Sequence, residues 1–166
     1  MNETMRRTLL ILAGLVGAAA GASAQDGPKF SIGYAYLRSL DTGGGSSTVG
    51  AFVSFAGGGA TALELDGGYH RDTRAGSTLE TFTLTAGPRF AFSSRRNSAP
   101  FMHLLGGLRR DRFEGVSSTA WGGMTGLGID VNTAGRVALR LGADFQIFFD
   151  HGENVKSLRL GVGLTF

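Results

Sequence analysis

The chain has 166 residues, the size of one ordinary domain, with 28 glycines, no cysteine and a formal net charge of +3. So much glycine argues against a helical bundle, because each glycine inside a helix costs about 1 kcal/mol relative to alanine. The lack of cysteine excludes disulfide scaffolds and thiolate metal sites, and basic residues that are few and scattered give no indication of a nucleic-acid partner.

The first 24 residues have the three parts of a secretory signal peptide. A short basic start ends at Arg6 and Arg7, an uncharged apolar run covers 9–22, and Ala-Ser-Ala at 22–24 is a small-residue cleavage pattern. The apolar run is shorter than the roughly 20 residues that a membrane-spanning helix needs. The sequence therefore predicts a signal-peptide helix at 1–24, export by the general secretion route, and one mature domain at 25–166.

From residue 29 onward, apolar residues recur at every second position, which is the period of a β-strand with one apolar and one polar or small face. Polar or glycine-rich stretches interrupt this period at 40–47, 57–59, 72–77, 93–98, 114–118, 132–135 and 150–154. Eight strands are therefore predicted, near 29–37, 48–55, 63–70, 81–90, 100–110, 120–131, 137–149 and 158–166. Long strands with short links predict a meander closed into an antiparallel up-and-down barrel, because closure removes the sheet edges.

The two faces of the strands decide between a soluble and a membrane barrel, since a membrane barrel carries its apolar face outward. On the strand near 100–110, whose alternation is the least clear, we expect Met102, Leu104 and Leu108 outward. The apolar faces hold large side chains on nearly every strand, more than the interior of an eight-stranded barrel accommodates. The polar faces are rich in glycine, which suits a narrow lumen. We therefore expect a transmembrane barrel; a soluble ligand carrier with an apolar interior is the alternative.

The charged residues of the polar faces are expected to pair inside the lumen, because a buried lone charge is very costly. The predicted ion network consists of Glu64, Asp66, Arg89, Arg109, Asp130, Arg140, Asp144 and Arg159. Antiparallel pairing of the last two strands puts Asp144 opposite or diagonal to Arg159, so an ion pair is predicted there. We expect this network to plug the lumen; a gate that opens for small solutes is the alternative.

Aromatic residues of the predicted outer wall gather near the strand ends, as the two interfaces of a bilayer select. One predicted belt contains Phe30, Phe55, Phe90, Phe101 and Phe166, and the other contains Tyr36, Tyr69, Trp121 and Phe149. The alternative interpretation is that these side chains belong to an ordinary apolar core.

Over 25–166 the sequence resembles the small eight-stranded outer-membrane β-barrel family, which includes the OmpA transmembrane domain and OmpX. The most specific mark is the ending, in which Leu160, Val162 and Leu164 alternate with small or polar residues before a terminal Phe166. The resemblance implies the outer membrane of a Gram-negative-type bacterium, contact with outer-membrane lipid and lipopolysaccharide, and an ending read by the barrel-insertion machinery.

The sequence thus predicts an outer-membrane protein of structural or surface-interaction type, with no catalytic residues, cofactor or metal site. One alternative is a narrow porin-like channel for small solutes. Another is a lipid A-modifying enzyme, but His70, His103 and His151 are scattered and none stands in a nucleophile context. The basic stretch 109–112 would contact lipopolysaccharide phosphates if it lies at the outer rim. The residues indicate no solute or oligomeric state.

Overall fold

A computed structural model describes residues 27–41, 46–74, 77–92, 98–134, 137–150 and 152–166. It contains eight strands: β1 (Lys29–Ser39), β2 (Ser47–Ala56), β3 (Thr61–Arg74), β4 (Ser77–Ala91), β5 (Ser98–Phe113), β6 (Val116–Ala134), β7 (Val137–Asp150) and β8 (Glu153–Thr165). Among these residues, no helix has the length and apolar character needed to cross a membrane. The predicted signal peptide at 1–24 lies outside the described residues.

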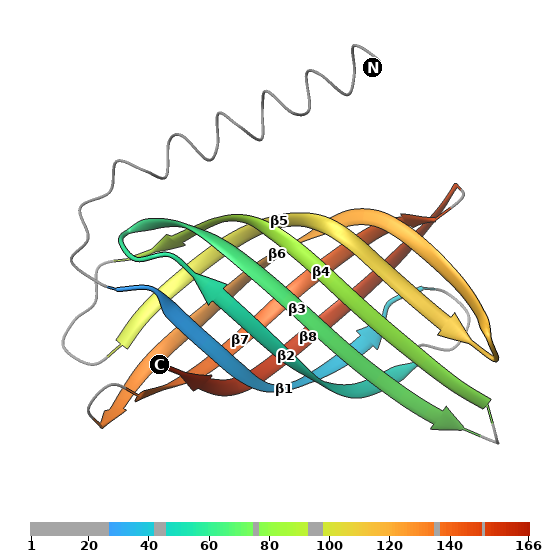
Figure 1. The fold of residues 1–166 in the computed structure, drawn as a ribbon, viewed down its shortest axis with the longest axis horizontal. Helices are drawn as coiled ribbons and strands as arrows, with labels where there is room; N and C mark the ends of the chain where they lie inside the picture. The colour runs from blue at the N-terminus through green and yellow to red at the C-terminus, as the bar shows by residue number, and fades with distance from the viewer. Residues whose placement is uncertain (1–26, 42–45, 75–76, 93–97, 135–136, 151) are drawn as a thin grey trace, which may run out of the picture.

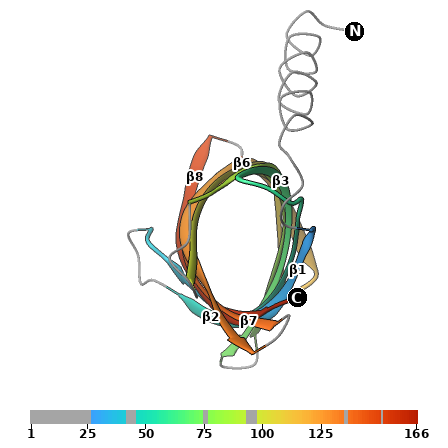
Figure 2. The ribbon, with the colours of Figure 1, turned by 90° about the vertical axis from the view of Figure 1, so that its left-hand side faces the viewer.

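Every strand pairs antiparallel with its neighbours in the chain, and β8 pairs with β1 to close the ring (Figures 1 and 2). The predicted eight-stranded up-and-down barrel is therefore confirmed. We call the end where β1 begins and β8 ends the terminal end. The opposite end, where β1 connects to β2, β3 to β4, β5 to β6 and β7 to β8, is the hairpin end.

The hairpins continue further than the sequence predicted. The β5–β6 ladder extends to the pair Phe113 and Val116, so the predicted link at 114–118 is a two-residue turn. Glu114 and Gly115 both have positive φ, 48° and 86°, as the tight turn of a two-residue hairpin requires. Polar residues between Asp111 and Thr119 resembled a loop, but a hairpin that projects into water tolerates them on both faces.

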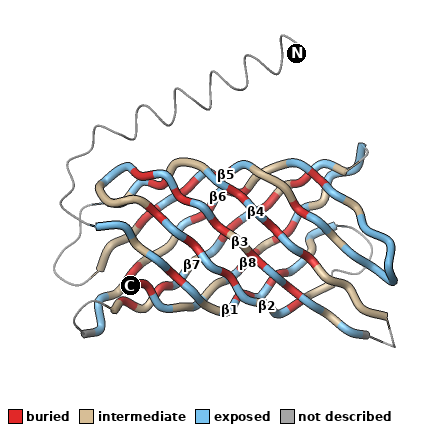
Figure 3. The backbone as a smooth tube through the Cα atoms, viewed as in Figure 1, coloured by how far each residue is buried: buried red, intermediate tan, exposed pale blue. Residues whose placement is uncertain are grey.

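Burial alternates along the strands (Figure 3), because successive side chains of a strand point to opposite faces, here into the barrel and away from it. On β1, for example, Ser31 and Ala35 are buried while Tyr34 between them is 74% exposed. Leu104, Leu127 and other large apolar side chains face outward around the whole ring. Soluble proteins rarely expose an apolar surface of more than a few hundred Å². The outward-facing wall is therefore built for lipid, as the sequence predicted.

Candidate functional site in the barrel lumen

The first cluster of charged side chains in the lumen is centred on Arg159 of β8. Its Nε donates a hydrogen bond to Asp144 Oδ2 on β7 at 2.7 Å. Its two terminal nitrogens donate to the two oxygens of Asp66 on β3 at 2.8 and 3.1 Å, which is a bidentate pair. The structure thus brings together the predicted partners Asp144 and Arg159, and the same guanidinium also connects one wall of the barrel to the wall across the lumen.

A second cluster lies beside the first and is centred on Asp130 of β6. This carboxylate accepts hydrogen bonds from Arg140 Nε on β7 at 2.8 Å and from Arg89 Nη2 on β4 at 2.9 Å. Arg140 also donates from Nη1 to Ser54 Oγ on β2 at 2.8 Å, and the same nitrogen is 3.5 Å from Glu64 Oε1. Through these contacts Arg89 and Arg140 connect side chains of β2, β3, β4, β6 and β7 across the lumen.

His103 on β5 joins the two clusters and was not among the predicted members of the network. Its Nδ1 lies 3.0 Å from Glu64 Oε2, and its Nε2 lies 2.9 Å from Asp144 Oδ1. An ionised carboxylate only accepts hydrogen bonds, so both ring nitrogens donate and the ring is an imidazolium. His103 then balances the charges of the network, which has four carboxylates against three guanidinium groups.

The backbone register explains how these side chains meet. His103 on β5 is the cross-strand partner of Gly126 on β6, Gly126 is the partner of Asp144 on β7, and Asp144 is the partner of Arg159 on β8. A Cβ at Gly126 would collide with Asp144 Oδ1 and lie 2.7 Å from His103 Nε2. The glycine therefore leaves the space in which His103 and Asp144 reach each other across the strand between them.

Arg109 lies in the lumen but contacts a different group of residues. Within the described part of the chain, its Nε donates to Asp111 Oδ2 at 2.7 Å and its Nη1 to Ser157 Oγ at 3.4 Å. Asp111 also accepts a hydrogen bond from Thr81 Oγ1 at 2.5 Å. Seven of the eight predicted members thus form one network, which His103 completes, whereas the eighth, Arg109, pairs with Asp111 nearer the hairpin end.

The prediction that Phe101 belongs to an aromatic belt is wrong. Phe101 is 3% exposed and faces the lumen, where the guanidinium carbon of Arg89 lies 3.8 Å from the ring centroid and that of Arg140 lies 4.8 Å away. The reason is the alternation of β5: Met102 and Leu104 point outward, so Phe101 must point inward. Its ring packs against the network through cation–π contacts.

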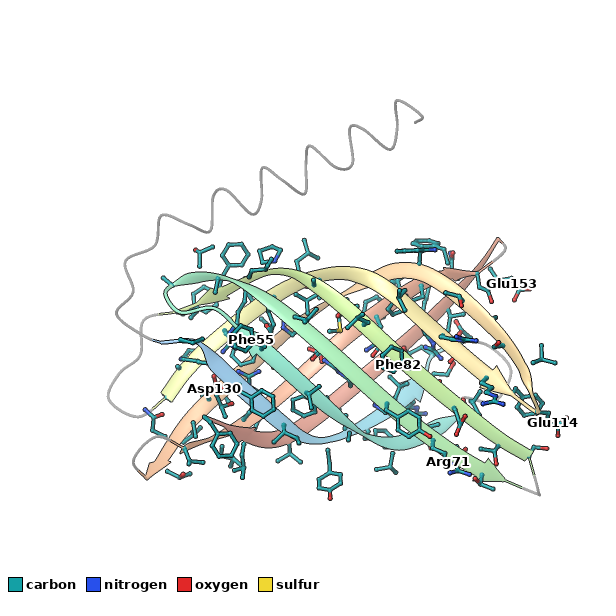
Figure 4. The ribbon with its side chains drawn as sticks, in the orientation of Figure 1. Phe55, Arg71, Phe82, Glu114, Asp130 and Glu153 are labelled. Atoms are coloured by element: carbon teal, nitrogen blue, oxygen red, sulfur yellow. The ribbon has the colours of Figure 1, made fainter. Side chains whose placement is uncertain are left out.

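The other aromatic residues predicted for the belts all face outward. They are Phe30, Phe55, Phe90 and Phe166 toward the terminal end, and Tyr36, Tyr69, Trp121 and Phe149 toward the hairpin end. The four residues of the predicted insertion signal, Leu160, Val162, Leu164 and Phe166, also face outward and are 44–52% exposed. Figure 4 shows Phe55 toward the end opposite to Glu114 and Arg71.

Little space remains between the side chains of the lumen. The network and Phe52 surround a cavity of about 20 Å³, which is close to the smallest volume that holds one water molecule. A second cavity, of about 10 Å³, lies between Leu37, Thr48 and Arg109. Phe148, Leu105 and Met124 are at most 2% exposed and fill part of the remaining interior.

No protein-family model and no curated protein sequence matches the chain. Solved structures do match. Neisserial surface protein A superposes with a TM-score of 0.73 and 15% identity over 84% of this chain and 96% of that chain. Ail, the attachment invasion locus protein of Yersinia pestis, has a TM-score of 0.59 and 18% identity over 86% of this chain and all of that one.

The outer membrane protein OprG of Pseudomonas aeruginosa superposes with a TM-score of 0.55 and 11% identity, over 86% of this chain and 98% of that chain. The chain has the fold of the small outer-membrane β-barrels. This is the fold that the sequence resemblance implied, and the matches extend over nearly the whole length of these barrels.

Proposed function

We propose that the chain is an integral outer-membrane protein of a Gram-negative-type bacterium, of structural or surface-interaction type, whose lumen is filled by its own side chains. The observation that carries this proposal is the inside-out distribution of residues: an apolar wall outside and a paired ion network inside. The wall suits acyl chains, and the network ties the strands together across the lumen. The fold shared with a Neisserial surface protein and an attachment invasion protein supports this type of function.

The hairpin end is proposed to face the cell exterior and the terminal end the periplasm. Outer-membrane barrels have short turns on the periplasmic side and longer connections outside, and the projecting β5–β6 hairpin lies at the hairpin end (Figure 1). The proposed partners are outer-membrane lipid and lipopolysaccharide around the wall. The barrel-insertion machinery is proposed to read the ending from Leu160 to Phe166.

A closed lumen predicts that the protein conducts no steady ion current. The charged groups of the network are paired with one another, and the cavities hold at most about one water molecule each. In planar-bilayer recordings of the inserted protein, we expect the current to stay at the level of the bare bilayer, while an open porin recorded under the same conditions shows stepwise increases. Stepwise conductance from this protein would instead support the narrow porin-like channel.

We also propose that the protein is not an enzyme. His70 and His103 face the lumen and are 0% and 4% exposed, so neither meets a lipid that approaches the outer wall. His103 is engaged by two carboxylates. His151, the third histidine of the lipid A-modifying alternative, lies outside the described residues.

A further inference from the structure

A group of basic side chains faces outward at the hairpin end, on the wall formed by β3 to β6. Arg71 on β3, Glu80 on β4 and Arg112 on β5 are successive cross-strand partners. In the neighbouring row, Phe82 on β4 is the partner of Arg110 on β5. All three arginines are exposed, and Figure 4 shows Arg71 at the same end as Glu114. We call Arg71, Arg110 and Arg112 the arginine surface.

The wall beside the arginine surface is concave. A depression of about 460 Å³ is lined by Tyr69, Glu80, Phe82, Arg110, Arg112, Gly115 and Ser117. The hydroxyl of Tyr69 donates to Glu80 Oε1 at 3.0 Å, and Arg110 Nη2 donates to Ser117 Oγ at 3.2 Å. These contacts hold one carboxylate and one guanidinium at the rim of a space large enough for a sugar-phosphate headgroup.

The charges of this surface suit an anion. Arg71 and Arg112 flank Glu80 as its cross-strand partners, and Arg110 lies in the next row. A second carboxylate, Glu114, lines an adjoining depression with Glu80 and Arg112 and accepts a hydrogen bond from Ser77 Oγ at 2.6 Å, so the three arginines outnumber the two carboxylates. Guanidinium groups bind phosphate oxygens in a bidentate manner. The surface is therefore complementary to a group with more than one negative charge, such as a phosphate monoester.

The wall below the arginine surface is apolar, which indicates that the bound anion belongs to a lipid with acyl chains. Phe82 is 45% exposed, Leu84 is 40% exposed, and Trp121 is 67% exposed on the same side of the barrel. A phosphate ion free in solution could contact the arginines but would not cover these apolar side chains. A phosphorylated glycolipid places its acyl chains on them and its phosphates at the arginines.

We propose that the arginine surface binds the phosphates of the phosphorylated glycolipid of the outer leaflet, the lipid A part of lipopolysaccharide, with its acyl chains against Phe82, Leu84 and Trp121. This inference rests on the proposed outer-membrane location with the hairpin end outward. It adds to that function a defined lipid site on one side of the barrel.

The test measures lipid binding to the protein expressed from its full sequence and purified from membranes in detergent. Bis-phosphorylated lipid A, its dephosphorylated form and phosphatidylglycerol are titrated separately, and bound lipid is counted by native mass spectrometry. The double variant R110Q/R112Q is compared with the wild type and with R38Q. Arg38 is an outward-facing, exposed arginine of β1 at the same end, so R38Q is the matched control.

We expect the double variant to bind bis-phosphorylated lipid A about tenfold more weakly than the wild type, a difference within reach of two lost charge-assisted contacts. R38Q should stay within about twofold of the wild type, and the wild type should bind the dephosphorylated lipid and phosphatidylglycerol more weakly. Equal affinity of the double variant and the wild type, or equal affinity for phosphatidylglycerol, would overturn the inference.

Heat-dependent gel mobility of every sample separates this inference from the proposed function. If the wild type shows no compact, heat-sensitive form and does not insert into bilayers, the proposed function fails and the inference fails with it. If all samples are folded and inserted but the arginine substitutions change nothing, only the lipid site is wrong.

Discussion

Replacing Arg159 with alanine is expected to lower the free energy of unfolding by about 3–5 kcal/mol, the usual cost of removing one partner of a buried ion pair. The substitution leaves Asp66 without its bidentate donor and removes one of the donors to Asp144, and both carboxylates are at most 6% exposed. The loss is measured by urea titration in lipid vesicles, with heat-dependent gel mobility reporting the folded fraction.

The control for this prediction is Arg112→Ala, which removes an exposed arginine on the outer wall and is expected to change stability by less than about 1 kcal/mol. A second variant tests the cause. Adding Asp66→Asn to Arg159→Ala removes the carboxylate that loses its bidentate donor, while Asp144 keeps its contact with His103, and should recover part of the lost stability. If Arg159→Ala cost no more than Arg112→Ala, the network would not hold the barrel together.

Replacing Leu127 with arginine is expected to destabilise the inserted barrel by about 2–4 kcal/mol, the cost of a cationic side chain near the middle of a bilayer. Leu127 is 65% exposed in the middle of β6. On the surface of a soluble protein this substitution would fall within about 0.5 kcal/mol of neutral. Unfolding of the variant in vesicles, against the wild type, gives the value.

Val116→Arg is the matched control, because Val116 is 76% exposed on the same strand but next to the hairpin turn. A charge there lies beyond the proposed bilayer and should have little effect. Equal costs at the two positions, or none at either, would argue that the outer wall is not in contact with lipid.

The sequence was most informative where one residue decides the position of the next. The period of two assigned faces to all eight strands, because adjacent side chains of a strand point to opposite sides. The contact between Asp144 and Arg159 was within reach because their strands are consecutive and joined by a short link. Phe101 was assigned to the wrong face although the outward prediction for Met102 already contradicts it.

Contacts across the lumen were out of reach of the sequence. Arg159 and Asp66 are 93 residues apart, and whether they meet depends on the tilt and stagger of all eight strands. The bridging position of His103 depends in the same way on Gly126, since a side chain there would separate it from Asp144. The ends of the hairpins were also missed, since polar residues are typical of loops and of projecting strands alike.

The outward position of Trp121 gives the most direct test of the inside-out barrel. It is the single tryptophan of the chain and is 67% exposed on the outer wall. Its fluorescence is measured after insertion into vesicles of ordinary lipid and of lipid with brominated acyl chains, which quench on contact. We predict strong quenching by the brominated lipid, greatest when the bromines lie near the headgroups. Equal fluorescence in the two lipids would contradict a wall that faces acyl chains.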